Sequence, residues 1–575
     1  MRDAIQANFQ EKENADPSKI VKCYESHRKL NENGFKESCW TEAFVKESPP
    51  TFYDQTKLFE EYPTLYRLDG KLFFVVGEPG IGKTTLAREI LLQYATTSSS
   101  HGDLGSFVFS ISFRDIDYSE PVTFFEFLVK PLLPDWEYNG KQDSALLKVL
   151  NRLSDVYIVA DGLNEAKLDL FSSSPKAFNW NDRVIPDVIL RNLLAGYLFP
   201  KANVLVTSRP EALYKFPGNY RPRLFVMRLL GLGHETQKNL CRQMCKDDER
   251  VDSVVDAVFD KNSHQSGFLY NPVCCEIMVE TILNTFDLFD RDMNSEPGKE
   301  TITFLFTENF NRRVVSQEFA EDEALFNLTQ LALSGIKERK FIFEVSGIKT
   351  LDKKLFDTFL SNKTSASLHC KREASASTSK KVCFLRTLWQ EYFAAYHLMK
   401  CSGTENLERF LKDSHKENFE MVLKFLFGFL NPQVEKKIQH VRPTKSEDLH
   451  FDEKYLLLKN FFNASLEKGN FVEACAFSFE ANDQSLSTDV FNSLPEAYEL
   501  PEIVGECEAV AISHILKCNR AIRRTITLRT TNWPTFQGNS LQILLNAVNM
   551  HGHQVNKCTI PELCQTTHGN LQIEK

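Results

Sequence analysis

The chain has 575 residues, of which 42% are hydrophobic and 25% charged, and its formal net charge is −9. This length is too great for one hydrophobic core, and the composition is typical of ordinary globular domains. The weak negative charge excludes a whole-chain electrostatic surface for DNA or an anionic membrane. No apolar stretch reaches the roughly 20 residues of a membrane span, and the first residues lack the core of a signal peptide, so a cytoplasmic location is expected.

Residues 1–60 carry many charges and the pair Pro49-Pro50, and one helix is expected from Asp16-Pro17 onward. We expect this range to form a polar N-terminal segment that is too short and too polar for an independent effector domain.

The fourteen cysteines are scattered without a short-period framework, which favours reduced thiols packed as small hydrophobes. Cys241 and Cys245 stand at helical spacing without a paired histidine nearby, so core packing is favoured over zinc binding.

The sequence GEPGIGKT at residues 77–84 fits the pattern G-x-x-x-x-G-K-[ST] and follows the buried-strand run LFFVV. This pattern predicts a phosphate-binding loop. Gly77, Gly80 and Gly82 let the backbone curl so that N–H groups point at a β-phosphate, and the following helix adds its positive dipole end. Lys83 then reaches the β- and γ-phosphates, and the Thr84 hydroxyl ligates Mg²⁺.

Strand-like runs alternate with helical patterns between residues 70 and 230, which predicts a parallel α/β sheet. Their near-continuous apolar character indicates strands that helices cover on both faces. Ligands of such sheets bind at the carboxyl ends of the strands. The expected strands span residues 72–76, 107–113, 156–160, 204–207 and 224–227.

The third of these strands ends in Asp161, within the sequence DGLNE, which is a Walker B pattern. A carboxylate at this position lies across from the phosphate-binding loop, where it can hold the Mg²⁺ shell through water. Glu165 can orient or deprotonate an attacking water. A simple turn cap by Asp161 is the alternative.

The fourth strand is followed by Arg209. At the carboxyl end of a neighbouring strand, its guanidinium is placed to bind a γ-phosphate and to help distinguish a triphosphate from a diphosphate. An isolated arginine would more often be a surface salt-bridge partner.

After residue 230 the apolar spacing becomes helical almost throughout. Residues 361–380 are rich in serine and lysine and poor in large apolar side chains, which predicts a surface loop.

The phosphate-binding loop GEPGIGKTTL, the sequence DGLNE and the sequence TSRP together resemble the NACHT nucleotide-binding domain of NOD-like receptors, within the signal-transducing ATPases related to AAA+ proteins. The resemblance covers about residues 60–500 of this chain. Further similar segments are 107–114 to the family's second strand, 328–336 to its winged-helix segment, 389–395 to the helix that closes that domain, and 418–428 to its second helical domain.

This resemblance implies a P-loop NTPase fold with a parallel five-stranded sheet, in the order 5-1-4-3-2, followed by helical domains. The implied divisions are a polar segment at 1–60, a NACHT domain at 61–228, helical domain 1 at 229–295, a winged-helix domain at 296–400, helical domain 2 at 401–500 and a C-terminal segment at 501–575.

The resemblance also implies ATP or ADP with Mg²⁺ as cofactors. It adds Thr85 to the nucleotide-binding residues, and it implies that Pro272 of the pair Asn271-Pro272 packs on the adenine. The implied function is a switch: a closed ADP form, exchange to ATP, domain rotation and self-association in innate-immune or stress signalling. A signalling protein of unknown identity is the implied partner, and no clear nucleic-acid or membrane binding is expected.

Two residues depart from the family pattern. Asn164 stands where the family usually has the first of two acids, which leaves Glu165 to position water and predicts slow ATP hydrolysis as a switch reset. Arg386 stands where the winged-helix histidine normally touches the β-phosphate of ADP. A guanidinium can still bind a phosphate, and it always carries its charge.

The C-terminal segment is either the start of leucine-rich repeats or a generic cap. A helix at 509–516 and a strand at 525–528 are expected, but clear repeats are not present. Arg520, Arg523, Arg524 and Arg529 form a basic cluster that favours a solvated face over a nucleic-acid site. The functional alternatives are a different P-loop enzyme and a non-hydrolysing scaffold with bound nucleotide. No Asn-Lys-x-Asp sequence follows a strand, which disfavours a GTPase.

Overall fold

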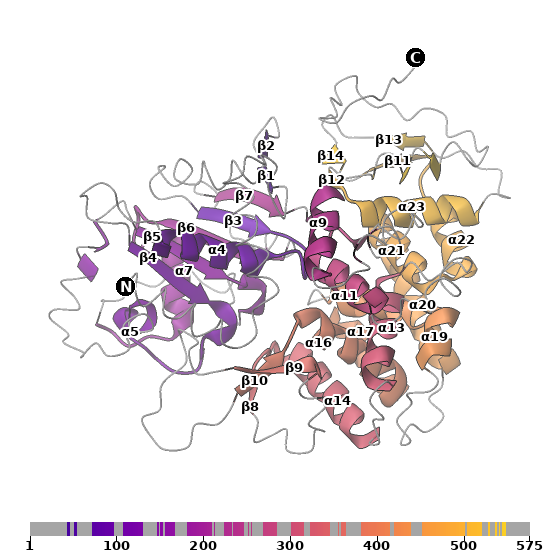
Figure 1. The fold of residues 1–575 in the computed structure, drawn as a ribbon, viewed down its shortest axis with the longest axis horizontal. Coiled ribbons are helices and arrows are strands. Elements are labelled where there is room, and N and C mark those ends of the chain that lie inside the picture. The colour runs from indigo at the N-terminus through magenta and orange to yellow at the C-terminus, as the bar shows by residue number, and fades with distance from the viewer. Residues whose placement is uncertain are drawn as a thin grey trace, which may run out of the picture.

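The structure is a computed structural model of the chain. It describes residues 43–45, 51–53, 72–96, 107–129, 147–148, 150–152, 156–166, 181–209, 212, 224–229, 231–232, 234–245, 251, 255, 268–283, 301–315, 322–344, 355, 358–363, 381–414, 419–438, 451–500, 503–519, 527–529, 535–536, 540, 543–544 and 546–547. An α/β half and a helical half lie side by side, and the boundary between them is where β3 ends (Figure 1). The helix expected from Asp16-Pro17 lies outside the described residues.

The α/β half is built on a seven-stranded sheet in the order β2-β1-β7-β3-β6-β5-β4. Neighbouring strands from β7 to β4 are parallel, and β1 is antiparallel to both β7 and β2. The strands are β1 (Ala43–Val45), β2 (Thr51–Tyr53), β3 (Leu72–Val76), β4 (Phe107–Ser112), β5 (Val156–Asp161), β6 (Asn203–Ser208) and β7 (Leu224–Leu229).

The expected five-stranded sheet is therefore extended by two strands, and this corrects the division at residue 60. Residues 43–45 and 51–53 belong to the sheet of the nucleotide-binding half and not to a separate polar segment. Pairing with β1 satisfies the outer N–H and C=O groups of β7, which an open edge would leave unpaired. The two strands have three residues each, too few to show a hydrophobic period.

Helices cover the sheet and explain its apolar strands. All five side chains of β3 and all six of β6 are buried. The helix α4 (Lys83–Thr96) packs against β5 and β6, while α5 (Phe124–Leu128) packs against β4. The helix α7 (Pro186–Ala195) begins with a proline, whose missing N–H costs nothing at that position.

The helical half contains most of the remaining secondary structure. The first group comprises α9 (His234–Met244), α11 (Pro272–Leu283), α13 (Ile302–Val315), α14 (Asp322–Glu338), α16 (Thr387–Tyr396) and the π-helix η6 (His397–Cys401). The second group comprises α17 (Thr404–Ser414), α18 (Glu420–Gly428), α19 (Pro432–Ile438), α20 (Phe451–Glu467), α21 (Phe471–Ala481), α22 (Gln484–Ser493) and α23 (Glu506–Cys518).

A small antiparallel sheet stands between α14 and α16, in the order β8-β10-β9. Its strands are β8 (Phe343–Glu344), β9 (Leu360–Lys363) and β10 (Lys381–Phe384). The loop expected at 361–380 is therefore wrong at its start, because residues 361–363 pair with β10. The hydrogen bonds with β10 hold these polar residues in a strand, which their sequence alone does not favour. Residues 364–380 lie outside the described part of the chain.

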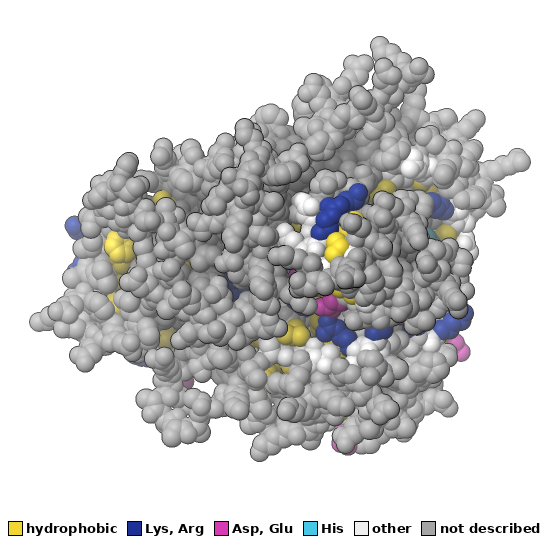
Figure 2. Space-filling model, viewed as in Figure 1, with side chains coloured by type: hydrophobic (Ala, Val, Ile, Leu, Met, Phe, Trp, Pro, Cys, Tyr) yellow, Lys and Arg dark blue, Asp and Glu magenta, His cyan; other side chains and the backbone are white. Residues whose placement is uncertain are grey.

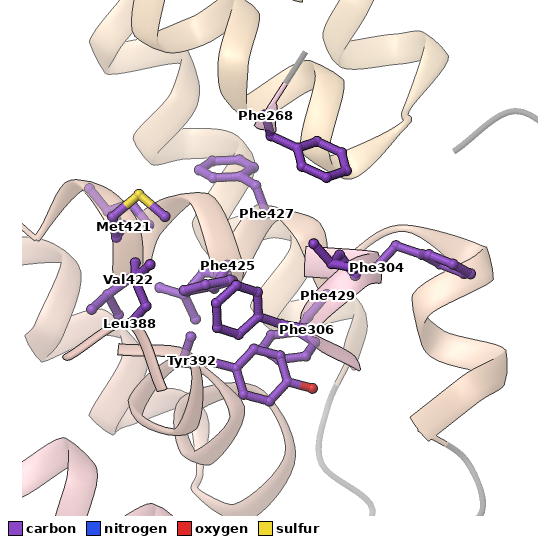
Figure 3. Close-up of a cluster of buried hydrophobic side chains, with 14 of the residues drawn as sticks. Phe268, Phe304, Phe306, Leu388, Tyr392, Met421, Val422, Phe425, Phe427 and Phe429 are labelled. Carbon is purple, nitrogen blue, oxygen red and sulfur yellow. The ribbon is translucent and has the colours of Figure 1, made fainter. Parts of the chain in front are cut away.

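An aromatic cluster joins α13, α16 and α18 (Figure 3). The ring of Phe306 lies 4.8 Å from Trp389 and 5.2 Å from Phe425 between centroids, and Tyr392 lies 5.4 Å from Phe425. The Tyr392 hydroxyl lies 3.0 Å from the Thr307 Oγ1. Such ring pairs stabilise by about 0.5–1.5 kcal/mol each beyond the apolar area they bury. The cluster therefore anchors α16 within the helical half.

The C-terminal segment and the residues just before it form two parallel strand pairs and one helix. β11 (Ala497–Glu499) pairs with β13 (Thr527–Arg529), and β12 (Ile503–Val504) pairs with β14 (Thr535–Phe536). The helix α23 connects them and covers the expected helix at 509–516. Partner strands are separated by about 30 residues, close to one leucine-rich repeat. Arg520, Arg523 and Arg524 lie outside the described residues.

The described part of the chain shows no large charged surface on the face that is drawn and no long apolar helix. On the face in Figure 2, the Lys and Arg side chains that are coloured form separate small groups, one of them beside an acidic side chain. Among the described helices, none is both long and apolar enough to cross a membrane. The described residues contain no cluster of three or more groups that could hold a metal ion, and Cys241 and Cys245 are buried in the core.

The protonation of His397 makes the stability of the folded protein depend on pH. This buried imidazole begins η6, and its Nδ1 lies 3.0 Å from the Thr329 Oγ1. Burial, with the charges of Lys337 and Lys454, lowers the pKa of His397 to about 4. The folded state therefore binds fewer protons than the unfolded state, whose histidine pKa is about 6.5. The stability this gives is complete above pH 6.5 and is lost as the pH falls toward 4.

We expect the wild-type protein to lose about 2 kcal/mol through this residue between pH 7 and pH 5. The variant His397→Gln should therefore show a smaller fall in melting temperature between these two pH values, measured by circular dichroism. An equal fall in the two proteins would mean that His397 titrates normally.

Candidate phosphate-binding site

The loop between β3 and α4 has the backbone that its sequence predicts. Gly80 and Gly82 have φ values of +82° and +101°, which only glycine adopts at low cost. The Gly77 N–H donates to the Ser208 carbonyl at 3.1 Å. The start of the loop, just after β3, is therefore attached to the end of the neighbouring strand β6. The Lys83 Nζ donates to the carbonyl oxygens of Gly77 and Glu78, both at 2.7 Å. The ammonium group therefore lies over the loop, as phosphate binding requires.

Thr84 and Thr85 follow in the first turn of α4. Thr84 is exposed and Thr85 is half-buried. The helix start directs its positive dipole end toward the loop. The exposed Thr84 hydroxyl is accessible to a metal ion, which fits the expected ligand role.

Asp161 ends β5 at the same edge of the sheet. Its Oδ1 accepts a hydrogen bond from the Thr207 Oγ1 at 2.5 Å, and the Gly162 N–H donates to that same Thr207 oxygen at 2.9 Å. Thr207 is fully buried at the end of β6. This threonine was not among the expected site residues, although it opens the sequence TSRP. It fixes the Asp161 carboxylate in an oxygen-rich position suited to Mg²⁺ through water.

Glu165 is held by an arginine that the sequence did not single out. Arg114 follows β4 in a 3-10 helix, and its Nε and Nη2 donate to the two Glu165 oxygens at 2.7 and 2.8 Å. The negative charge of Glu165 raises the pKa of Arg114 above its ordinary value. Both carboxylate oxygens thus accept from one guanidinium, so Glu165 is oriented but not free to rotate toward water.

Asn164 connects the two strand ends. Its Oδ1 accepts from the Arg209 N–H at 3.2 Å. The neutral amide keeps this backbone bond while adding no negative charge beside Asp161 and Glu165.

Arg209 contacts the helical half. Its Nη2 lies 2.6 Å from the Oε1 of Glu391, on α16, and the two side chains are 12% and 4% exposed. Burial raises the pKa of Glu391, against the opposing effects of Arg209 and Lys83. The guanidinium expected to face a γ-phosphate thus has a carboxylate partner in this conformation. Glu391 lies in segment 389–395, which resembles the helix that closes the winged-helix domain, but it was not among the expected site residues.

The two residues that precede α11 also contact the phosphate-binding loop. The Asn271 Nδ2 donates to the Pro79 carbonyl at 2.7 Å, and the Tyr270 hydroxyl donates to Glu78. A methyl group on Gly80 would lie 2.7 Å from the Asn271 Oδ1. Pro272 is the first residue of α11, directly after this contact. The expected adenine contact of Pro272 remains a prediction.

Arg386 is paired with an acidic residue of another helix. It caps the start of α16, and its Nη2 donates to the Glu276 Oε2, on α11, at 2.6 Å. In this conformation the guanidinium connects α16 to α11, so its expected contact with a β-phosphate remains a prediction. This pair could not be predicted from the sequence, because Glu276 is one of many acidic residues in the helices.

Two kinds of residue therefore meet at one edge of the sheet. The loop residues, Asp161, Glu165 and Arg209 come from the α/β half, while Asn271 and Glu391 come from the helical half. Together they can hold a phosphate chain with its metal ion, and they link its neighbourhood to two helices outside the sheet.

The comparisons with known proteins agree with this arrangement. Residues 71–248 match the NACHT domain family. The chain is 22% identical to "Protein NLRC3" from Mus musculus over 63% of this chain and 36% of that protein. It is 25% identical to "NACHT, LRR and PYD domains-containing protein 5" from Bos taurus over 73% of this chain and 39% of that protein. It is 25% identical to "NACHT, LRR and PYD domains-containing protein 3" from Macaca mulatta over 63% of this chain and 36% of that protein.

The chain spans less than two fifths of the length of each of these three relatives. Among solved structures, it is similar to a signal transduction ATPase with a tetratricopeptide repeat sensor from Pyrococcus horikoshii. That match has 13% identity and a TM-score of 0.31 over 86% of this chain and 63% of the other. The family match shows that residues 71–248 contain a NACHT domain, and the three relatives show that the chain is similar to NACHT-domain proteins of the NLR type.

Proposed function

We propose that the chain is an ATP- and ADP-binding regulatory switch. The observation that carries this proposal is that the helical half contacts the phosphate-binding loop and Arg209 directly, through Asn271 and Glu391. An enzyme that only turns over nucleotide has no need of such contacts. A switch needs them, because a change in the bound phosphates must alter the packing of another domain.

In this proposal the loop residues bind the phosphates. Gly77, Gly80, Gly82 and Lys83 cradle them, Thr85 adds a hydroxyl, and Pro272 packs on the base. Thr84 and Asp161 hold Mg²⁺, which would neutralise phosphate charge. The fit rests on the curled backbone of the loop, on Lys83 above it, and on the Asp161 carboxylate fixed by Thr207.

The proposed domains follow the described elements. The nucleotide-binding domain extends to residue 228 and includes β1 and β2. Helical domain 1 (229–295) contains α9 and α11, and the winged-helix domain (296–400) contains α13, α14, α16 and the small sheet. Helical domain 2 (401–500) contains α17 to α22. The C-terminal segment (501–575) contains α23 and completes a strand-helix-strand unit with β11, which supports the start of a leucine-rich repeat.

The described conformation is proposed to be the closed form. Two ion pairs hold α16 in place, Arg209 with Glu391 and Arg386 with Glu276. Exchange of ADP for ATP would release α16, and the domains would rotate and expose a surface for self-association. Innate-immune or stress signalling through a partner protein is the role that the family resemblance implies, and it is part of this proposal.

Hydrolysis is proposed to be slow and to reset the switch. The single acid Glu165 is bound at both oxygens by Arg114, so a water-positioning role requires the bidentate pair to loosen. A non-hydrolysing scaffold is the second candidate, and the same ion pair favours it. The two candidates differ in whether single-turnover hydrolysis is measurable.

The nucleotide that co-purifies with the protein tests the proposal. We expect ADP at close to one per chain after denaturation and ion-exchange chromatography, because the closed contacts slow its release. Bound GTP would contradict the assignment of the base, and a chain that neither retains nor rebinds adenine nucleotides would contradict the switch itself.

A further inference from the structure

Glu391 occupies an unusual position for a carboxylate. It lies in the second turn of α16 and is 4% exposed, and its Oε1 pairs with Arg209 at 2.6 Å. Its other oxygen, Oε2, is buried and has no hydrogen-bond partner among the residues that the structure describes. An unmade hydrogen bond on a buried charged group is costly. A carboxylate with one free oxygen is therefore not explained by its ion pair alone.

Glu391 lies near the residues that are proposed to bind the phosphates. The charges of Lys83 and Glu165 are close enough to shift its pKa in opposite directions. One turn earlier on α16, the Leu388 Cδ1 would lie 2.9 Å from a methyl group on Gly80. The helix thus lies against the phosphate-binding loop, and its carboxylate faces the same cations that a terminal phosphate would need.

Three cationic and three acidic side chains of this region balance one another before any phosphate is bound. Lys83, Arg114 and Arg209 are cationic, and Asp161, Glu165 and Glu391 are acidic. A γ-phosphate would compete with Glu391 for Arg209 and would add negative charge beside a buried carboxylate. Like charges in a poorly solvated site repel strongly.

We infer that Glu391 is a specificity-determining residue that stands in for the γ-phosphate and makes the closed form selective for a nucleoside diphosphate. With a diphosphate, its carboxylate supplies the anion that Arg209 requires. With a triphosphate, the terminal phosphate takes Arg209, and repulsion displaces Glu391 together with α16. This inference rests on the proposed switch and names the residue that reads the number of phosphates.

The test compares Glu391→Gln with wild type. Glutamine keeps the shape and an oxygen that can accept from Arg209, but removes the charge. The measurement is the ratio of the dissociation constants of a non-hydrolysable ATP analogue and of ADP, by calorimetry. We expect this ratio to fall about tenfold in Glu391→Gln. Glu391→Asp, which keeps the charge, should retain most of the wild-type ratio.

Glu435→Gln is the matched control. Glu435 pairs with the buried Lys400 at 3.0 Å, away from the phosphate-binding loop, so its variant loses a similar ion pair without changing the charge near the phosphates. Its ratio should equal that of wild type. An unchanged ratio in Glu391→Gln, or an equal weakening of both nucleotides there, would overturn the inference and leave Glu391 a packing residue.

A second measurement uses the wild-type protein alone and does not depend on the folding of a variant. Amide hydrogen exchange over residues 387–396 should be faster with the ATP analogue than with ADP, because α16 leaves the loop. Equal protection in the two states would overturn the inference. If wild type binds neither nucleotide, the proposed switch fails first, so the two failures are distinguishable.

Discussion

Substitution of Lys83 by alanine should lower the affinity for ADP and ATP by about 100-fold or more. The Lys83 ammonium lies over the loop, bonded to the carbonyl oxygens of Gly77 and Glu78. A phosphate chain would take those donors as charge-assisted hydrogen bonds, each contributing about 1.5–3 kcal/mol. Alanine removes the charge while leaving the glycine backbone intact. Calorimetry or a fluorescent nucleotide measures the loss.

Lys412→Ala is the matched control, because Lys412 is exposed and pairs with Glu408 on its own helix. It should bind nucleotide like wild type. If Lys83→Ala were purified with stoichiometric ADP, the assignment of residues 77–84 as the phosphate-binding loop would be wrong.

The second large effect is expected on hydrolysis. Glu165→Gln should slow single-turnover ATP hydrolysis by about 100-fold, since a positioned acid or base contributes at least that much. The change is nearly isosteric, but glutamine has a single acceptor oxygen, so only one of the two hydrogen bonds from Arg114 can be kept. The affinity for ADP should change little, because Glu165 is expected to act on water and not on the phosphates.

Glu408→Gln, at an exposed acid, should leave the rate unchanged. An unaltered rate in Glu165→Gln would assign the water-positioning role to another residue. A wild-type protein that binds ATP without measurable hydrolysis would instead favour the scaffold.

The local patterns predicted much of the α/β half. A glycine spacing, a strand that ends in Asp161 and a strand that ends before Arg209 each reflect short stretches of backbone whose chemistry is readable from adjacent residues. The apolar strands were readable for the same reason, because burial on both faces leaves a continuous hydrophobic run. β1 and β2 were not predictable, since strands of three residues show no hydrophobic period and form by pairing, β1 with β7 and β2 with β1.

The partners of the site residues could not be predicted. Arg114 with Glu165, Arg209 with Glu391 and Arg386 with Glu276 each join separate elements, and two of these pairs join separate proposed domains. Which arginine meets which acid depends on how domains pack, and no local pattern encodes it. The aromatic cluster of α13, α16 and α18 is what fixes α16, and therefore Glu391, at the loop.

The central claim is that the bound nucleotide sets the packing of the helical half against the phosphate-binding loop. Sedimentation velocity of the wild-type protein, with saturating ADP and then with a non-hydrolysable ATP analogue, tests it most directly. The switch predicts a compact monomer with ADP and a more extended or self-associated species with the analogue. Identical compact monomers, with both nucleotides shown to be bound, would contradict it.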